Sequence, residues 1–98
     1  MIELNLIELK AAAMVLRSVQ NPVRKTMINL IHETPGITVK EIYGTMRLEQ
    51  PVASLHLGIL RKSGIVRTVR EGKLIHYYLD DNIESILLLA NQLAKFFS

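Results

Sequence analysis

Hydrophobic positions recur at alternating spacings of four and three residues along the first part of the chain. The stripe consists of Ile2, Leu6, Leu9, Ala13 and Leu16. This spacing places the side chains on one face of an α-helix and is close to the seam of a helix that packs against another helix. Because Leu4, Ile7 and Val15 add apolar surface beyond the stripe, we expect a helix over residues 2–19 that is buried on more than one side.

A second apolar stripe begins after Asn21 and Pro22. Asparagine is a favourable N-cap, and proline in the first helical position sacrifices no hydrogen bond. The inner face of this second helix consists of Val23, Met27, Leu30 and Ile31. We expect the helix to end at Thr34-Pro35-Gly36, because proline and glycine do not continue a helix.

The segment 38–64 predicts a pair of helices joined by a short turn. Thr38 and Glu41 have the spacing of a capping box, which indicates a helix of about two turns. Pro51 fits the first turn of the next helix, and Gly64 fits the left-handed residue that follows a helix end. The core stripe of this next helix is Ala53, Leu57, Leu60 and Gly64.

Residues 65–79 predict two short strands rich in Val, Ile and Tyr. Arg70-Glu71-Gly72-Lys73 joins them as a hairpin, because glycine readily adopts the positive φ that a tight turn requires.

Asp81 and Glu84 then indicate the cap of a last helix over 81–97, with apolar side chains along one side. The order of elements, α-α-α-α-β-β-α, predicts a mostly α single domain over residues 1–98 with a winged helix-turn-helix fold.

The outer face of the helix that begins near Gln50 is unusual for a short surface helix, because it does not alternate Lys and Glu. Gln pairs with adenine, Ser with several base edges, and an apolar side chain can touch a thymine methyl group. Basic side chains at the end of the helix can reach phosphates, which position a protein on DNA without specifying sequence. The candidate DNA-contacting residues are Gln50, Pro51, Ser54, Leu55, His56, Gly58, Arg61 and Lys62.

Two of these residues have an alternative explanation. Gly58 could bring the helix close to the DNA backbone or allow close packing against another helix. His56 borders the core stripe and could donate a hydrogen bond either to a phosphate or to a neighbouring helix.

Charge is unevenly distributed over a chain with a net charge of +3. The basic residues between positions 61 and 73 are Arg61, Lys62, Arg67, Arg70 and Lys73, and the only acid among them is Glu71. Such a local patch is either a solvated surface or a contact for an anionic partner such as nucleic acid.

Composition excludes several other classes of protein. With 98 residues, of which 49% are hydrophobic, the chain suits one folded domain. It contains no cysteine, so disulfides and thiolate metal sites are excluded. The apolar run near the end is interrupted by Asn91, Gln92 and Lys95 and is too short to span a bilayer. No signal-peptide pattern is visible at the start, and we expect a cytoplasmic protein with no membrane contact.

Catalytic chemistry is not indicated. His32 lies near the end of a helix, where a cation interacts favourably with the helix dipole. His76 alternates with Ile75 and Tyr77 in a strand, and we expect it to point outward while its neighbours pack. Without a phosphate loop, a nucleophile–base arrangement or facing carboxylates, the sequence predicts neither an enzyme nor a cofactor.

From Leu16 to Leu79 the chain resembles the ArsR/SmtB family of bacterial winged-helix repressors. Three motifs carry the resemblance: Asn-Pro-x-Arg from Asn21 at the start of the second helix, Ser-x-His-Leu-x-x-Leu from Ser54 with the later Gly64, and Arg-Glu-Gly-Lys from Arg70 ahead of Tyr77.

The resemblance implies a homodimer that binds double-stranded DNA at an imperfect inverted repeat. Two recognition helices would enter successive major grooves about 34 Å apart. Arg67, Arg70 and Lys73 in the wing would lie along adjacent phosphates or in the minor groove. The first and last helices would form the dimer interface through Ile2, Leu6, Leu9, Ala13, Leu16, Ile86, Leu87, Ala90, Leu93 and Phe97. The same side chains could instead pack within one chain.

The sequence departs from the family in two respects. Residues 37–41 contain no soft ligand where many relatives carry a metal box, and no histidine follows His76, so we expect no metal or cysteine-redox regulation. A signal would then be a small organic ligand at the dimer interface or a partner protein, or there would be no signal at all. Leu55 and Gly58 stand where relatives often have polar or basic residues, and Glu49 adds a negative charge nearby. The apolar Leu55 and the hydrophobic ends of the chain also suggest an alternative function, a protein-interaction module without specific DNA binding.

Overall fold

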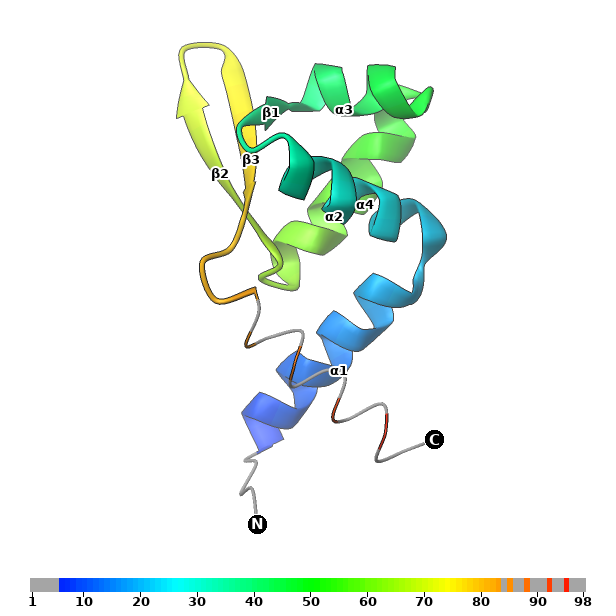
Figure 1. The fold of residues 1–98 in the computed structure, drawn as a ribbon, viewed down its shortest axis with the longest axis vertical. Coiled ribbons are helices and arrows are strands. Elements are labelled where there is room, and N and C mark those ends of the chain that lie inside the picture. The colour runs from blue at the N-terminus through cyan, green and yellow to red at the C-terminus, as the bar shows by residue number, and fades with distance from the viewer. Residues whose placement is uncertain (1–5, 84, 86–87, 89–91, 93–94, 96–98) are drawn as a thin grey trace.

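The computed structural model describes residues 6–83 together with residues 85, 88, 92 and 95. The elements, in chain order, are α1 (Leu6–Gln20), α2 (Pro22–Glu33), β1 (Ile37–Thr38), α3 (Val39–Met46), α4 (Gln50–Lys62), β2 (Val66–Glu71) and β3 (Leu74–Leu79). Helices α2, α3 and α4 pack with the sheet into one body, and α1 projects from one end of it (Figure 1). The predicted winged helix-turn-helix fold is confirmed.

Local sequence signals determine where these helices begin. The Asn21 side-chain oxygen accepts hydrogen bonds from the backbone N–H groups of Val23 and Arg24 at 2.9 and 3.2 Å, as expected of an N-cap. Thr38 and Glu41 form the predicted capping box at the start of α3. The predicted glycine after α4 is also confirmed, since Gly64 has a φ of +77°.

The sheet has three antiparallel strands in the order β1-β3-β2, one more than the hairpin predicted from the sequence. Strand β1 pairs Ile37 with Tyr77 and Thr38 with His76. With two residues it has no periodicity of its own, and it is a strand only because β3 lies beside it. The two predicted strands are therefore present, and the prediction missed the third, β1.

The hairpin between β2 and β3 closes through two residues, Gly72 and Lys73. Gly72 has a φ of +61°, which confirms the predicted role of glycine in the turn. Arg70 stabilises the same turn, because its Nε donates a hydrogen bond to the carbonyl oxygen of Gly72 at 3.2 Å.

The core lies where α2, α3 and α4 meet the first residues of the hairpin. Its largest fully buried apolar side chains are Met27, Ile31, Ile42, Leu57, Leu60 and Ile65. Of the predicted core stripe of α4, Ala53, Leu57 and Leu60 are buried, whereas Gly64 lies beyond the end of the helix and is half-buried. Ile42 of α3 is buried as well. On α2 only Met27 and Ile31 of the predicted face are fully buried, and Val23 and Leu30 are half-buried.

Helix α1 packs on the body through a different face from the predicted stripe. The buried residues are Ala12, Val15 and Ser18, whereas Leu6 and Ile7 are exposed at the free end. The Ser18 and Ser63 hydroxyl oxygens lie 2.6 Å apart and join α1 to the end of α4. Within one chain the described side chains of α1 are buried on one face, and burial of a second face against a partner stays a prediction.

The predicted last helix, 81–97, lies mostly outside the described residues, although those described from Ile83 onward have helical backbone. The cap differs from the prediction. Asp80, not Asp81, accepts a hydrogen bond from the backbone N–H of Asn82 at 2.9 Å. The expected partner Glu84 is not among the described residues.

Candidate nucleic-acid interface

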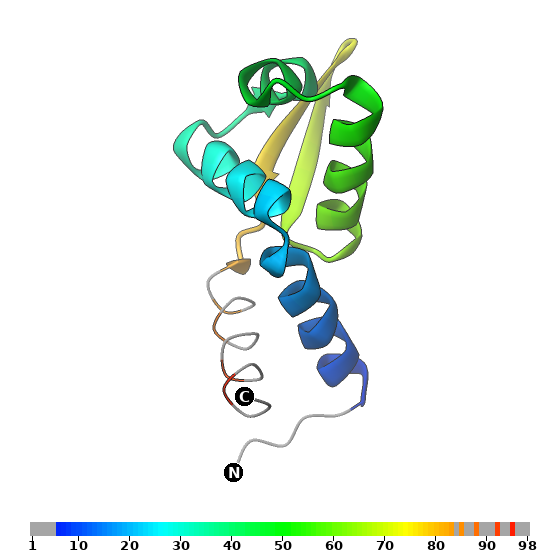
Figure 2. The same ribbon diagram turned by 90° about the vertical axis from the view of Figure 1, so that its right-hand side faces the viewer.

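Helix α4 has one buried face and one face open to solvent, and it runs along the edge of the body (Figure 2). The buried stripe of Ala53, Leu57 and Leu60 fixes the rotation of the helix about its axis. This rotation leaves six of the candidate DNA-contacting residues exposed: Gln50, Pro51, Ser54, Leu55, Arg61 and Lys62. The other two, His56 and Gly58, are half-buried.

Gly58 has open space around it. A Cβ atom built on it would meet no atom within 4 Å among its non-local neighbours. Close packing against another helix of this chain therefore does not explain the glycine in the described structure. A small residue here leaves the surface of α4 free for an approach from outside.

His56 contacts the neighbouring helix α2. Its Nδ1 lies 3.1 Å from Nη1 of Arg24. Because a guanidinium group can only donate, Nδ1 accepts, and the neutral ring carries its proton on Nε2. Burial, and then the positive charge of Arg24, lower the pKa of His56. His56 therefore does contact a neighbouring helix, but it accepts the hydrogen bond that we expected it to donate. Donation from Nε2 to a phosphate stays a prediction.

Arg24 connects three helices. Its Nε donates to the carbonyl oxygen of Ser18 at 2.9 Å, and its Nη2 lies 3.4 Å from the carbonyl oxygen of Arg17. The last carbonyls of a helix have no partner within the helix, so Arg24 satisfies the end of α1 from the first turn of α2. With His56 as its third contact, it also holds the inner flank of α4.

Sequence reasoning gave Arg24 no role, although it is the arginine of the Asn-Pro-x-Arg motif. The N-cap at Asn21 places it in the first turn of α2, beside the end of α1. That signal was present in the motif, but the partners of the side chain depend on how α1 and α4 pack.

The three wing residues do not lie on one face of the hairpin. Arg67 pairs across the strands with Tyr78, and Arg70 pairs with Ile75. Since side chains alternate along a strand, positions 67 and 70 point to opposite faces. Lys73 lies in the turn and is exposed.

Arg67 already has partners at the base of the hairpin. Its guanidinium carbon lies 4.8 Å from the centre of the Tyr78 ring, and its Nη2 lies 3.9 Å from Oδ1 of Asp81. Stacking on tyrosine and attraction to a carboxylate both hold the group near β3. Arg70 and Lys73, at the tip, are the wing cations open to a phosphate.

His76 is directed inward, and the expectation that it points to solvent is wrong. Its Nδ1 lies 2.7 Å from the carbonyl oxygen of Gly36, which can only accept a hydrogen bond. In the pairing of β3 with β1, His76 lies opposite Thr38. The expectation failed because the sequence did not predict strand β1. In an isolated hairpin the His76 ring would lack the neighbouring backbone that β1 provides.

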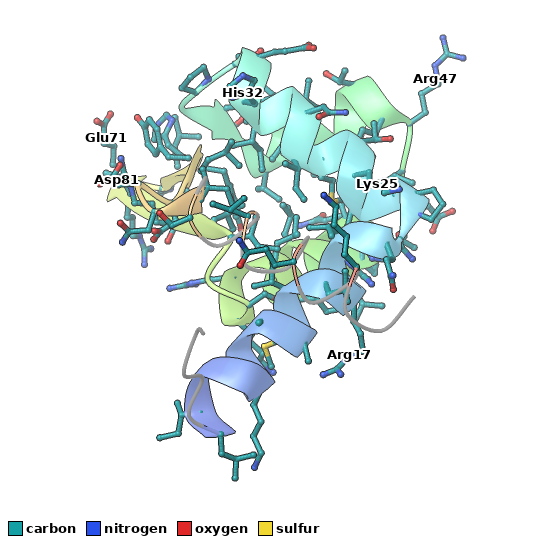
Figure 3. All side chains as sticks on the ribbon, turned by 60° about the horizontal axis from the view of Figure 1, so that its bottom comes forward. Arg17, Lys25, His32, Arg47, Glu71 and Asp81 are labelled. Atoms are coloured by element: carbon teal, nitrogen blue, oxygen red, sulfur yellow. The ribbon has the colours of Figure 1, made fainter. Side chains whose placement is uncertain are left out.

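Basic side chains dominate the exposed part of α4 and the tip of the wing. Within the described residues, none of Arg61, Lys62, Arg70 and Lys73 forms an ion pair with an acidic side chain. Glu71 lies near the tip but is 3.8 Å from Nε2 of His76. Glu71 and Asp81 share one side of the molecule, away from Arg17, Lys25 and Arg47 (Figure 3).

The predicted dimer surface is only partly described. Leu6 is exposed, and Ala13 and Leu16 are half-buried. The backbone of Leu9 belongs to α1. Residues outside the description are Ile2, Ile86, Leu87, Ala90, Leu93 and Phe97.

Two other kinds of site are absent from the described residues. They contain no group of three or more His, Cys, Asp or Glu side chains that could hold a metal ion. None of the helices in this part of the chain has the length and apolar character needed to cross a membrane.

Comparison with known proteins agrees with this geometry. No family model matches the chain. The chain is 34% identical over 83 residues to an uncharacterized HTH-type transcriptional regulator of Methanocaldococcus jannaschii, covering 84% of this chain and 93% of that protein. It is also 34% identical over 74 residues to the HTH-type transcriptional repressor SmtB of Mycobacterium tuberculosis, which covers 76% of this chain. The chain belongs to the ArsR/SmtB family.

Solved structures of ArsR/SmtB regulators have the same fold. The transcriptional repressor BigR from Xylella fastidiosa is 32% identical, with a TM-score of 0.68 over 94% of this chain and 91% of that one. The repressor PagR of Bacillus anthracis is 25% identical, with a TM-score of 0.72 over 87% and 99% of the two chains. This chain spans 54% of the length of the Mycobacterium SmtB repressor.

The relatives are transcriptional regulators and not enzymes, which confirms the prediction that this ArsR/SmtB protein is not an enzyme.

Proposed function

We propose that the protein is a homodimeric transcriptional repressor that binds an inverted-repeat DNA operator. Helix α4 would enter the major groove, and the wing would contact phosphates or the minor groove beside it. In this proposal residues 38–64 form the helix-turn-helix, 65–79 form the wing, and 1–19 and 81–97 supply the dimer helices.

The main support for this proposal is the composition of the exposed face of α4. Gln50 and Ser54, which can hydrogen-bond to base edges, lie toward its N-terminus, and Arg61 and Lys62 lie at its C-terminus. The short polar groups could hydrogen-bond to base edges in the groove. The cations that follow them could contact the phosphates beside it. The core stripe directs this face outward, and the wing tip adds Arg70 and Lys73.

A dimer would double this surface. Two copies of α4 related by a twofold axis reach successive major grooves if their centres are about 34 Å apart. The exposed end of α1, with Leu6 and Ile7, supports a partner there, because a helix end with uncovered apolar side chains gains stability when a second copy buries them.

Regulation by metal ions or cysteine oxidation does not form part of the proposal. The chain has no cysteine. Its histidines are also spread over separate elements: His32 is at the end of α2, His56 contacts Arg24, and His76 contacts Gly36. An effector would be a small organic molecule or a partner protein.

Fluorescence anisotropy tests the proposal. The purified protein is titrated into labelled duplex from its own upstream region and into a scrambled duplex of the same composition, at several salt concentrations. We expect a preference of about 10³ or more for the upstream duplex. A dimer that meets six to ten phosphates should lose about 10³ to 10⁵ in affinity between 50 and 200 mM salt. Equal and weak binding to both duplexes would contradict the proposal for that operator.

The alternative, a protein-interaction module, is favoured by one observation. Leu55 is 63% exposed at the centre of the outer face of α4, and exposed apolar side chains are common in protein interfaces. This alternative predicts a stable complex with another protein in nuclease-treated extract, together with duplex binding no tighter than the non-specific level.

A further inference from the structure

The exposed face of α4 carries two apolar side chains between its polar and basic residues. Leu55 is 63% exposed and Val52 is 41% exposed. At about 100° per residue, Leu55 lies almost opposite the buried stripe of Ala53, Leu57 and Leu60. Val52 precedes it by three residues and is therefore its neighbour on the helix surface.

The surroundings of Leu55 leave it open to a large partner. Ser54 beside it is short, and an added side chain at Gly58, one turn later, would meet no non-local atom within 4 Å. Lys62 lies on the same line two turns further on, where it would reach the phosphates that flank a groove. Leu55 is thus exposed near the middle of the outer face of α4, where a surface lying along that face would contact it.

The major groove offers only one apolar group to such a side chain. Base edges there present hydrogen-bond donors and acceptors, and thymine alone adds a C5-methyl group. A leucine pressed against a donor or acceptor removes its water without replacing the hydrogen bond, which is unfavourable. Contact with a methyl group instead buries apolar surface on both sides.

We propose that Leu55, supported by Val52, is a specificity-determining residue that selects thymine by its methyl group in each half-site. This inference rests on the proposed DNA-binding function. Leu55 stands where relatives often have a polar or basic residue, and the inference explains this difference by contact with a thymine methyl group in the operator.

Uracil provides a test because it differs from thymine only in lacking the methyl group. Duplexes that the full-length protein enriches from a randomised pool are synthesised once with thymine and once with uracil in the half-sites, and both are titrated by anisotropy. Removal of one buried methyl group should weaken binding about fourfold, and removal of one in each half-site about fifteenfold.

Two variants separate Leu55 from general effects of uracil on the duplex. Leu55→Ala should bind the thymine and uracil duplexes equally, with about the affinity of the wild-type protein for uracil DNA. Alanine favours the helix and position 55 is exposed, so the fold should be retained. Leu74→Ala removes a leucine that is 54% exposed in the wing and should keep the wild-type preference for thymine.

Three outcomes would overturn the inference. Equal wild-type affinity for thymine and uracil duplexes, with specific binding retained, would leave the proposed function standing and direct the apolar face of α4 toward a protein partner. A thymine preference that persists in Leu55→Ala would assign the methyl contact to another residue. A pool with no enriched sequence would contradict the proposed function and this inference together.

Discussion

Arg24 shows how one side chain can determine the position of a recognition element without touching DNA. It joins the last carbonyls of α1 to the imidazole of His56 on α4 through the three nitrogens of its guanidinium group. Lysine cannot replace this arrangement, because its ammonium group is a single point of charge.

Replacing Arg24 should therefore destabilise the protein. We expect Arg24→Ala to lower the free energy of unfolding by about 1.5–3 kcal/mol, the range for hydrogen bonds to charged groups. Arg24→Lys should recover only part of this loss. Urea denaturation measures both, with the exposed neighbour Lys25→Ala as the control, which should stay within about 0.5 kcal/mol of wild type. An Arg24→Ala protein as stable as the control would show that these contacts contribute nothing.

The lowered pKa of His56 predicts a dependence of stability on pH. Above its ordinary pKa of 6.5 the ring is neutral in both the folded and the unfolded chain. As the pH falls below that value, the unfolded chain takes up a proton before the folded one does, so the free energy of unfolding decreases until the pH passes the folded pKa.

His56→Gln removes this titration and should flatten the decrease. Chemical denaturation of both proteins between about pH 7.5 and 5.5 measures the difference, and the other histidines are present in both. Identical pH profiles for wild type and His56→Gln would show that the contact with Arg24 does not bias the protonation of His56.

At the scale of single residues, sequence reasoning succeeded where the signal was local. The N-cap at Asn21 and the positive φ of Gly64 and Gly72 follow from the chemistry of one or two neighbouring residues. It was wrong for His76, whose ring contacts the carbonyl oxygen of Gly36, forty residues earlier in the chain. Exposure of the candidate residues on α4 was predictable because a clear core stripe defines the opposite face.

Helix α4 and the wing carry different parts of the proposed recognition. Ser54 lies on the exposed face of α4 and Lys73 in the hairpin turn. Contacts with base edges distinguish sequences, whereas contacts with phosphates are the same for every sequence. The two elements can therefore be separated by mutation.

Ser54→Ala should reduce the ratio of affinities for the preferred and the scrambled duplex. Lys73→Ala should weaken binding to both by the same factor and reduce the salt dependence by about one unit of slope for each phosphate that the variant no longer binds. Anisotropy titrations of both variants at several salt concentrations measure these effects. A loss of preference in Lys73→Ala with no change in Ser54→Ala would reverse the assignment of the two elements.

At the scale of elements, the periodic segments were predicted and the shortest one was not. Helix α2 was marked by an N-cap and an apolar stripe, α3 by a capping box, and α4 by Pro51, an apolar stripe and Gly64. Strand β1 has two residues, both buried, and its pairing with β3 arises from tertiary structure. Contacts that arise from tertiary structure are not visible in the sequence, so Arg67 was predicted to contact DNA without its neighbours Tyr78 and Asp81.

The molecule as a whole has an exposed apolar end. Helix α1 covers the body with Ala12 and Val15, but Leu6 and Ile7 are 65% and 79% exposed. A sequence stripe indicates only that a helix packs on something, and cannot distinguish its own chain from a second copy. The structure shows that part of this surface is not covered by the described part of the chain.

A charge at this end should prevent the proposed dimer. We expect Leu6→Glu to shift the protein from dimer to monomer in sedimentation velocity and to weaken binding to the preferred duplex, since two half-sites would no longer be bound together. Asn29→Glu, on the exposed surface of α2, adds the same negative charge away from α1 and is the control. A wild-type protein that sediments as a monomer at high concentration would contradict the dimer.

The most direct test of sequence-specific dimeric recognition is the selection of duplexes by the full-length protein from a randomised pool, followed by sequencing. We expect an enriched inverted repeat whose half-site centres lie about 10 base pairs apart, one turn of the double helix. A pool that remains random after selection, although the protein is folded, would contradict it.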